Sequence, residues 1–212
     1  MHFVHYGHSC VLLDTGAARL LFDPGVFSSF EDVRGVDAVL ITHLHADHLD
    51  PARLPALLEV NPGAQLVVDA DSAAVVRDLG LEPTVVEIDT TLTVAGVQVK
   101  PVGGTHAEIH REIPRPANAG YIVADGAFYH PGDALYVPEE SIDVLGVPVG
   151  APWLRLGEAV DFTREVAPRV AVPIHERTLS EAGIQIALSR LQAMAPEKTT
   201  TTVLPSAQET EV

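Results

Sequence analysis

The chain has 212 residues, 47% of them hydrophobic, and is therefore long enough to bury a substantial core. No apolar stretch approaches the ~20 residues of a membrane span, which argues against a membrane partner. With 13 Lys and Arg against 29 Asp and Glu, the formal charge of −16 repels polyanions and disfavours nucleic acid as a partner.

We expect a single domain spanning residues 1–212, because no Gly/Ser linker or internal repeat divides the sequence. The one cysteine, Cys10, excludes an internal disulfide and favours a reducing, cytoplasmic location. The sequence leaves the oligomeric state open, and a homo-oligomer is compatible with it.

Short apolar runs separated by turn residues predict a series of strands in the first half of the chain. These strands cover residues 3–6, 11–13, 20–22, 36–41, 66–68, 85–88, 92–94 and 97–102. Two helices interrupt the series, one over 51–60 after Asp50-Pro51, and one capped by Asp71-Ser72 that runs through Leu79.

The second half opens with an irregular stretch, 103–119, which is long enough to predict a functional loop. Further strands are expected over 121–124, 127–129, 144–147 and 170–173, and helices over 158–166 and 180–194. The tail, 199–204, either adds an edge strand or stays loose. Two blocks of strands, each followed by helices, predict two sheets stacked face to face with helices outside.

The segment Thr42-His43-Leu44-His45-Ala46-Asp47-His48 follows the apolar run 36–41 directly. It therefore lies on a loop between a buried strand and a helix, where side chains from a rigid scaffold converge. Imidazole and carboxylate groups are ligands for zinc, manganese or iron. The alternative is a polar loop that is merely rich in histidine, but this spacing after a strand favours a metal site.

A centre with two metals needs more ligands than this segment supplies. His106, Asp133 and His175 each lie one to five residues beyond a predicted strand, so all three are expected at the same edge of the sheets. Any one of them alone would be explained as a capping or core polar residue. As a set they predict the missing ligands.

With these residues the chain resembles the metallo-β-lactamase fold superfamily of binuclear metallohydrolases, over nearly its whole length. The residues that fit its five motifs, in order, are Asp23; His43, His45, Asp47 and His48; His106; Asp133; and His175. Tyr6-Gly7-His8-Ser9 and Tyr129-His130-Pro131-Gly132-Asp133 resemble the compact branch that includes L-ascorbate-6-phosphate lactonase.

The chain departs from other branches of that superfamily. It is too short for the additional nuclease domain of the RNA-processing branch, has no flavin domain, and lacks the cysteine ligand of several true β-lactamases. The loop of the third motif carries both His106 and His110, and we prefer His106 because it lies closer to the strand end.

The resemblance implies an α/β fold of four layers (αββα) and two divalent ions, Zn²⁺ first, with Mn²⁺, Fe²⁺ or Ni²⁺ as alternatives. It implies that one ion takes His43, His45 and His106, that the other takes Asp47, His48 and His175, and that Asp133 bridges them. A hydroxide shared by the ions would then attack a small-molecule ester, lactone or phosphoester, with Asp47 and Asp133 as the catalytic carboxylates.

Other residues are candidates for contacts behind the ligands or with substrate. Asp23 is expected to orient a metal-bound histidine. The remaining candidates are His8, His110, His130, Asn118, Arg111 and Trp153. For each an ordinary explanation stays open: Arg111 balances Glu108 and Glu112, and Trp153 covers core.

Two alternative functions accompany the leading hypothesis of a small-molecule hydrolase. One is a phosphodiesterase or nuclease of the same fold, which the acidic charge disfavours. The other is a metal-binding protein without turnover.

Overall fold

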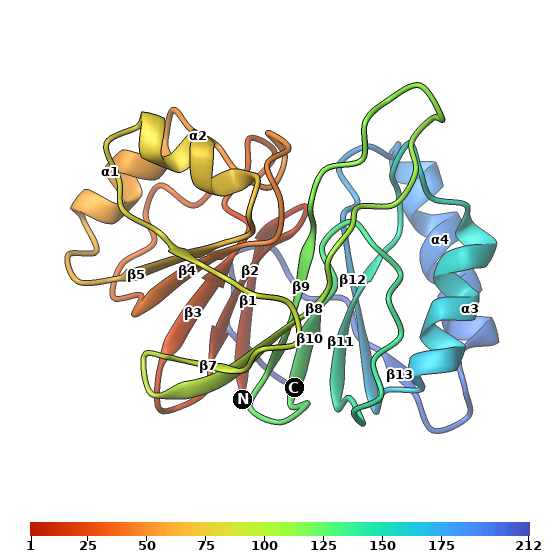
Figure 1. Cartoon of the computed structure of the whole chain (residues 1–212). Helices are drawn as coiled ribbons and strands as arrows, with labels where there is room; N and C mark the ends of the chain where they lie inside the picture. The colour runs from red at the N-terminus through yellow and green to blue at the C-terminus, as the bar shows by residue number, and fades with distance from the viewer.

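The computed structural model describes residues 1–212 and consists of two seven-stranded sheets packed face to face between two pairs of helices (Figure 1). This architecture confirms the predicted α/β fold of four layers. The first sheet has the order β14-β1-β2-β3-β4-β5-β6. Its strands are β1 His2–Gly7, β2 Cys10–Asp14, β3 Arg19–Phe22, β4 Ala38–Ile41, β5 Gln65–Val68, β6 Thr84–Val85 and β14 Thr210–Glu211.

The second sheet has the order β13-β12-β11-β10-β9-β8-β7. Its strands are β7 Leu92–Val94, β8 Val97–Gly103, β9 Ala119–Val123, β10 Phe128–His130, β11 Val144–Pro148, β12 Val170–Ile174 and β13 Thr200–Thr201. Both sheets are mixed, with parallel pairing from β3 to β6 and from β10 to β13.

Helices cover the outer face of each sheet (Figure 1). The first sheet is covered by α1 Leu54–Glu59 and α2 Ser72–Asp78, and the second by α3 Leu156–Val166 and α4 Glu181–Met194. None of the four has the length and apolar character that crossing a bilayer requires.

Alternating residues of the central strands pack into different layers, which explains why these strands are apolar on both faces. In β3, Leu20 and Phe22 face the core between the sheets, whereas Leu21 packs under α1 and α2. In β12, Val172 faces the same central core and Ala171 packs under α3 and α4. Three cores therefore hold the four layers together.

The structure corrects three predicted boundaries. The first helix begins at Leu54 rather than residue 51, because the Asp50 carboxylate accepts hydrogen bonds from the Ala52 and Arg53 amides and holds a turn there. The strand expected over 85–88 is only β6, because the chain then crosses to the second sheet, where the Asp89 amide donates to the Pro101 carbonyl. The tail adds β13 and an unpredicted strand, β14.

Asp69, at the end of β5, is a buried carboxylate with one oxygen unsatisfied. Its Oδ1 accepts hydrogen bonds from the Asp71 and Ser72 amides, at 2.9 and 3.2 Å, while Oδ2 is buried without a partner. Burial raises the pKa of Asp69 to about 6. Because this pKa lies above that of the unfolded chain, the charged carboxylate destabilises the fold above pH ~6, and this penalty disappears below pH ~4.

We therefore expect Asp69→Asn to gain stability relative to the wild type as the pH rises. Between pH 4 and pH 8 the difference in free energy of unfolding should grow by about 2–3 kcal/mol in favour of the variant. Urea denaturation of both proteins at several pH values measures this difference. A difference that stays constant with pH would show that Asp69 titrates normally.

Candidate metal centre

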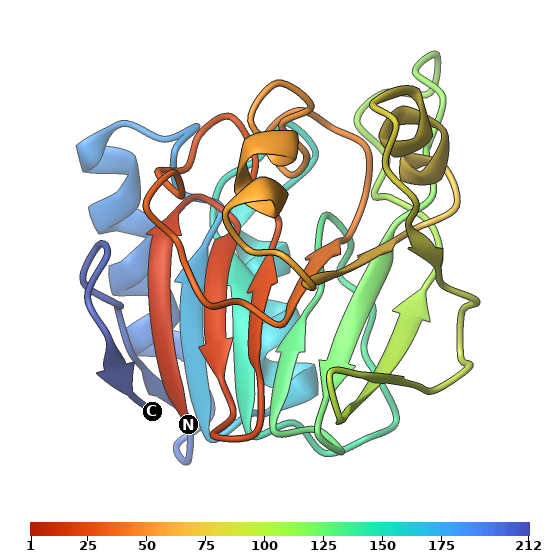
Figure 2. The same cartoon turned by 90° about the vertical axis from the view of Figure 1, so that its left-hand side faces the viewer.

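The loops that carry the predicted ligands lie at one edge of both sheets, opposite the two chain termini (Figure 2). This follows from the strand directions. In the first sheet β1, β3 and β4 run the same way, and in the second sheet β8, β10 and β12 do. Each of these strands ends just before a polar side chain at this edge, namely His8, Asp23, His43, His106, Asp133 and His175, in that order.

Eight side chains at this edge form two compact groups, in each of which the potential ligand atoms lie within 4.8 Å of one another. One group contains His43, His45, His106 and Asp133; the other contains His8, Asp47, His48 and His175. The structure therefore brings together all seven residues that the resemblance implied as ligands, and it adds His8.

Asp133 lies between the two groups. Its Oδ1 is 3.0 Å from Nε2 of His48 and 3.1 Å from Nε2 of His175. Its Oδ2 is 3.4 Å from Nε2 of His106 and 4.0 Å from Nε2 of His43. Each carboxylate oxygen thus faces a different group, as a bridging ligand would.

Four of the histidines have their outer nitrogen held by an acceptor. The Nδ1 atom of His48 donates to Asp23 Oδ2 at 2.7 Å, that of His106 to the Ala107 carbonyl at 2.6 Å, and that of His175 to the Gly150 carbonyl at 2.5 Å. Nδ1 of His43 lies 3.0 Å from the Thr42 hydroxyl, which donates its own hydrogen to Asp23 and so accepts from the ring. Each ring therefore turns Nε2 toward the centre.

These inward atoms fit a cation. Nε2 of His48, His106 and His175 and Oδ1 of Asp133 are all buried, and although Asp133 Oδ1 lies 3.0 Å from His48 Nε2 and 3.1 Å from His175 Nε2, none of these atoms has a partner with hydrogen-bond geometry. Buried polar atoms are rarely left unpaired, because each loses its hydration without compensation. A cluster of lone pairs at one point is explained by divalent cations bound between them.

The electrostatics of His43 and Asp47 agree with that explanation. Burial, followed by the charge of His48, lowers the pKa of His43 well below its ordinary value, so this ring is neutral. Burial opposes ionisation of Asp47, but the hydrogen bond from His8 and the charge of His48 outweigh it and lower the pKa to about 2. Neutral imidazole and ionised carboxylate are the forms that bind metal. For His48, burial is outweighed by the Asp133 and Asp23 carboxylates, which raise the pKa of this ring well above its ordinary value, so a bound metal would displace its Nε2 hydrogen.

Three residues at the same edge have strained backbone. His8, Asp23 and His175 have φ angles of 57°, 44° and 63°, in the left-handed region that residues other than glycine seldom adopt. Such strain persists only where surrounding contacts impose it, and it is common at functional sites.

The other candidates fall into two classes. Asn118 and His130 are buried and support the Asp133 loop: Asn118 Oδ1 accepts from the Asp133 amide at 2.9 Å, and His130 Nδ1 accepts from the Gly132 amide at 3.2 Å. His110 and Arg111 are exposed in the 104–118 loop, outside both groups, and Arg111 pairs with Glu112. Between the two histidines of this loop, only His106 faces the centre.

Trp153 contacts the centre directly. Its indole Nε1 donates to Asp133 Oδ2 at 2.8 Å, and its ring lies edge-on to those of His106 and His175. Sequence reasoning left open whether this residue covers core. The sequence around Trp153 offers only the preceding Pro152 as a turn signal, and a turn does not specify the contact with Asp133.

A model of the beta-lactamase superfamily domain matches residues 3–175, a range that begins before His8 and ends at His175. The chain belongs to the metallo-β-lactamase superfamily. All eight residues of the two groups lie within the matched range. The superfamily that the five motifs resembled is thereby confirmed, and with it the fold.

The chain is also similar to individual proteins of known sequence or structure. The chain is 48% identical to the protein Rv0786c of Mycobacterium tuberculosis, over 92% of each chain. It is 24% identical to the UPF0173 metal-dependent hydrolase Ta0764 of Thermoplasma acidophilum, over 97% of this chain and 95% of the relative. Among solved structures it shares its fold with Igni18, a metallo hydrolase of Ignicoccus hospitalis, with a TM-score of 0.75 and 20% identity, covering 100% of this chain and 98% of the other.

Proposed function

We propose that the chain is a binuclear, metal-dependent hydrolase that acts on a small-molecule ester, lactone or phosphoester. The observation that carries this proposal is the position of Asp133, whose two oxygens face two groups of ligand atoms, several of them buried without partners. Membership of the metallo-β-lactamase superfamily and the metal-dependent hydrolase among its relatives support it.

In this proposal His43, His45 and His106 hold one divalent ion, Asp47, His48 and His175 hold the other, and Asp133 contacts both. Zinc fits the nitrogen-rich ligand set best, and Mn²⁺, Fe²⁺ or Ni²⁺ are alternatives. Bound ions would supply Lewis acidity and a water of lowered pKa.

The protein's own residues hold this centre in place. Asp23 fixes the ring of His48, and Asn118 and Trp153 fix Asp133 from its backbone and its carboxylate. Asp47 is the more accessible of the two central carboxylates, with 24% of its side chain exposed against 4% for Asp133. Substrate is therefore expected to approach from the side of Asp47.

Charge favours a small molecule over nucleic acid. The formal charge is −16, and Arg111, the cation expected to reach a phosphate, has 80% of its side chain exposed and pairs with Glu112 at 3.8 Å. The net negative charge of the chain would repel a polyanion. A cytoplasmic location, in keeping with the buried free thiol of Cys10, is part of the same proposal.

Metal reconstitution tests the proposed function. The purified protein is stripped with a chelator, reloaded separately with Zn²⁺, Mn²⁺, Fe²⁺ and Ni²⁺, and assayed on aryl esters, lactones, phosphomonoesters and phosphodiesters. We expect two equivalents of metal and metal-dependent hydrolysis of at least one small substrate. His2→Ala, at an exposed position of β1, serves as a matched control. Less than one equivalent of every metal would refute the proposal.

Removing the indole N–H of Trp153 should weaken metal binding at the centre. Trp153→Phe keeps a large aromatic ring but leaves Asp133 Oδ2 without its 2.8 Å hydrogen bond, so the carboxylate is less well fixed. Loss of such a supporting contact typically weakens metal binding or activity by about 10–100-fold. Competition with a chromophoric chelator measures the affinity, and binding within twofold of the wild type would show that the indole N–H has no such role.

A further inference from the structure

His8 is the member of the two groups whose role the five motifs do not assign. It is fully buried, and every polar atom of its backbone is engaged. Its amide donates to Glu176 Oε1 at 3.1 Å, and its carbonyl accepts from His5 Nε2 at 2.8 Å and from the His175 amide at 2.9 Å. These contacts hold the left-handed backbone and fix where the ring lies.

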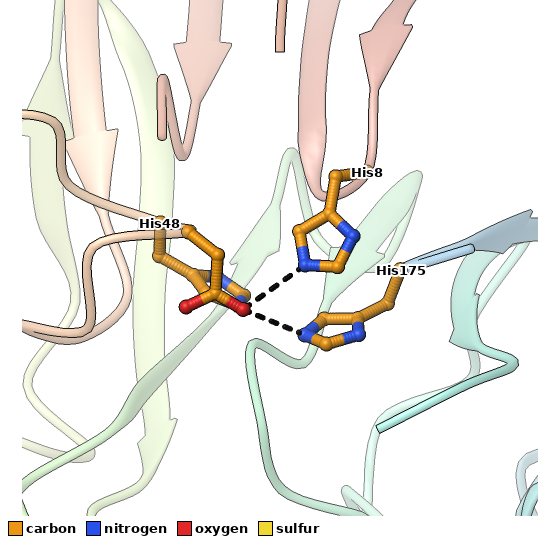
Figure 3. Close-up of side chains that lie close together, drawn as sticks. His8, His48 and His175 are labelled. Carbon is orange, nitrogen blue, oxygen red and sulfur yellow. Dashed lines mark hydrogen bonds and ion pairs between the residues drawn. The ribbon is translucent and has the colours of Figure 1, made fainter. Parts of the chain in front are cut away.

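The ring nitrogens of His8 have different partners. Nδ1 lies 3.3 Å from the backbone amide of Arg177, which can only donate, so Nδ1 is the acceptor of that hydrogen bond. A neutral imidazole carries one hydrogen, and with Nδ1 accepting, that hydrogen is on Nε2. Nε2 lies 3.1 Å from Asp47 Oδ2 and therefore donates to it (Figure 3).

This arrangement is the reverse of that in the neighbouring His175. Nδ1 of His175 donates to the Gly150 carbonyl behind it, so the neutral ring turns an unprotonated Nε2 inward. In Figure 3 the rings of His8 and His175 both point toward this carboxylate, and of these two His8 reaches it with a hydrogen on the inward nitrogen.

We propose that His8 is not a metal ligand but a positioning residue, whose Nε2–H holds Asp47 Oδ2 toward the metal position defined by His48 and His175. This inference rests on the proposed metal centre. Asp47 Oδ2 lies 3.6 Å from His175 Nε2 and 4.0 Å from His48 Nε2, which places this oxygen beside both inward nitrogens. Asp47 is partly exposed, so without His8 its carboxylate is free to turn toward water.

Ligation by His8 would require its hydrogen to move to Nδ1, where it would face the N–H of Arg177. Two donors would then oppose each other in a buried site, and both would lose a hydrogen bond. A neutral donor also suits this position better than Lys or Arg, because it adds no positive charge beside a divalent ion.

Two substitutions separate the donor role from a general structural role. His8→Gln keeps an amide N–H at about the reach of Nε2, whereas His8→Phe keeps a ring of similar size without nitrogen. We expect His8→Phe to weaken the second of two Zn²⁺ binding steps by about 10–100-fold while the first changes less than twofold. His8→Gln should recover most of the loss. His2→Phe, at the exposed start of the strand that leads to His8, should bind as the wild type does.

Nitrogen NMR of ¹⁵N-histidine-labelled protein, without metal and with Zn²⁺, reads the tautomer directly. We expect His8 to carry its hydrogen on Nε2 in both states. A hydrogen on Nδ1 in either state, or a metal-shifted Nε2, would overturn the inference, and so would a His8→Gln variant as weak as His8→Phe. If the wild type binds no Zn²⁺, the proposed metal centre fails, while the tautomer in the metal-free protein is still tested.

Discussion

Replacing Asp133 with alanine should abolish turnover and lower bound metal from two equivalents to less than one, while the fold persists. Both metal positions lose a ligand at once, because Oδ1 faces His48 and His175 and Oδ2 faces His106. The negative charge that offsets the repulsion between two close dications is lost as well. No single histidine substitution removes a ligand from both positions.

Substitutions of Asp133 should lower metal binding to different extents. Asp133→Asn keeps an oxygen that can contact one ion but loses the charge, so it should bind metal to an intermediate extent. For each variant, mass spectrometry measures the metal content and circular dichroism measures whether the fold is retained. Asp133 is buried, although it lies in a loop at the edge of the sheets. The fold should nevertheless survive, because the side chain points into the centre rather than into an apolar core. Two full equivalents of metal in Asp133→Ala would exclude the bridging role.

Gly25→Ala should destabilise the protein strongly and disrupt binding of the second metal. A Cβ at residue 25 would lie 1.9 Å from the Asp47 carbonyl oxygen and 2.5 Å from the His48 amide nitrogen. Both contacts are with backbone, so relief requires the Asp47–His48 segment to move. Forcing extra volume into such a site costs about 3 kcal/mol or more, which lowers the melting temperature by roughly 6–12 °C.

Gly157→Ala is the matched control, because a Cβ there meets no atom within 4 Å and the residue lies in α3. The same chemical change should raise stability by up to about 1 kcal/mol, since alanine favours helix over glycine. Calorimetry and Zn²⁺ titration of both variants test the contrast. Equal stability of the two variants would show that the Asp47–His48 backbone yields easily, and that its geometry is not set by Gly25.

The arrangement of the layers followed from residue patterns. Apolar alternation located the strands that form the core, because the side-chain period of a strand is set by the backbone. The short elements were harder. Thr84–Val85 and Thr210–Glu211 each pair over two residues, and such pairing depends on where the rest of the chain passes. No local pattern carries that information.

In the candidate site, too, some features were predictable from local sequence and others depended on distant residues. His43, His45, Asp47 and His48 are adjacent in sequence, so their joint role was visible in the motif, whereas His106, Asp133 and His175 were found from their positions after strands. The contact of Trp153 with Asp133 and the reversed tautomer of His8 were not accessible, because each depends on partners distant in sequence. Such contacts exist only once the two sheets have packed.

We propose that two divalent ions lie on either side of Asp133. An anomalous-difference map from crystals of the Zn²⁺-loaded protein tests it most directly. Two peaks about 3.5–4 Å apart are expected, one beside His43, His45 and His106 and the other beside Asp47, His48 and His175. A single peak, or peaks away from Asp133, would contradict the account.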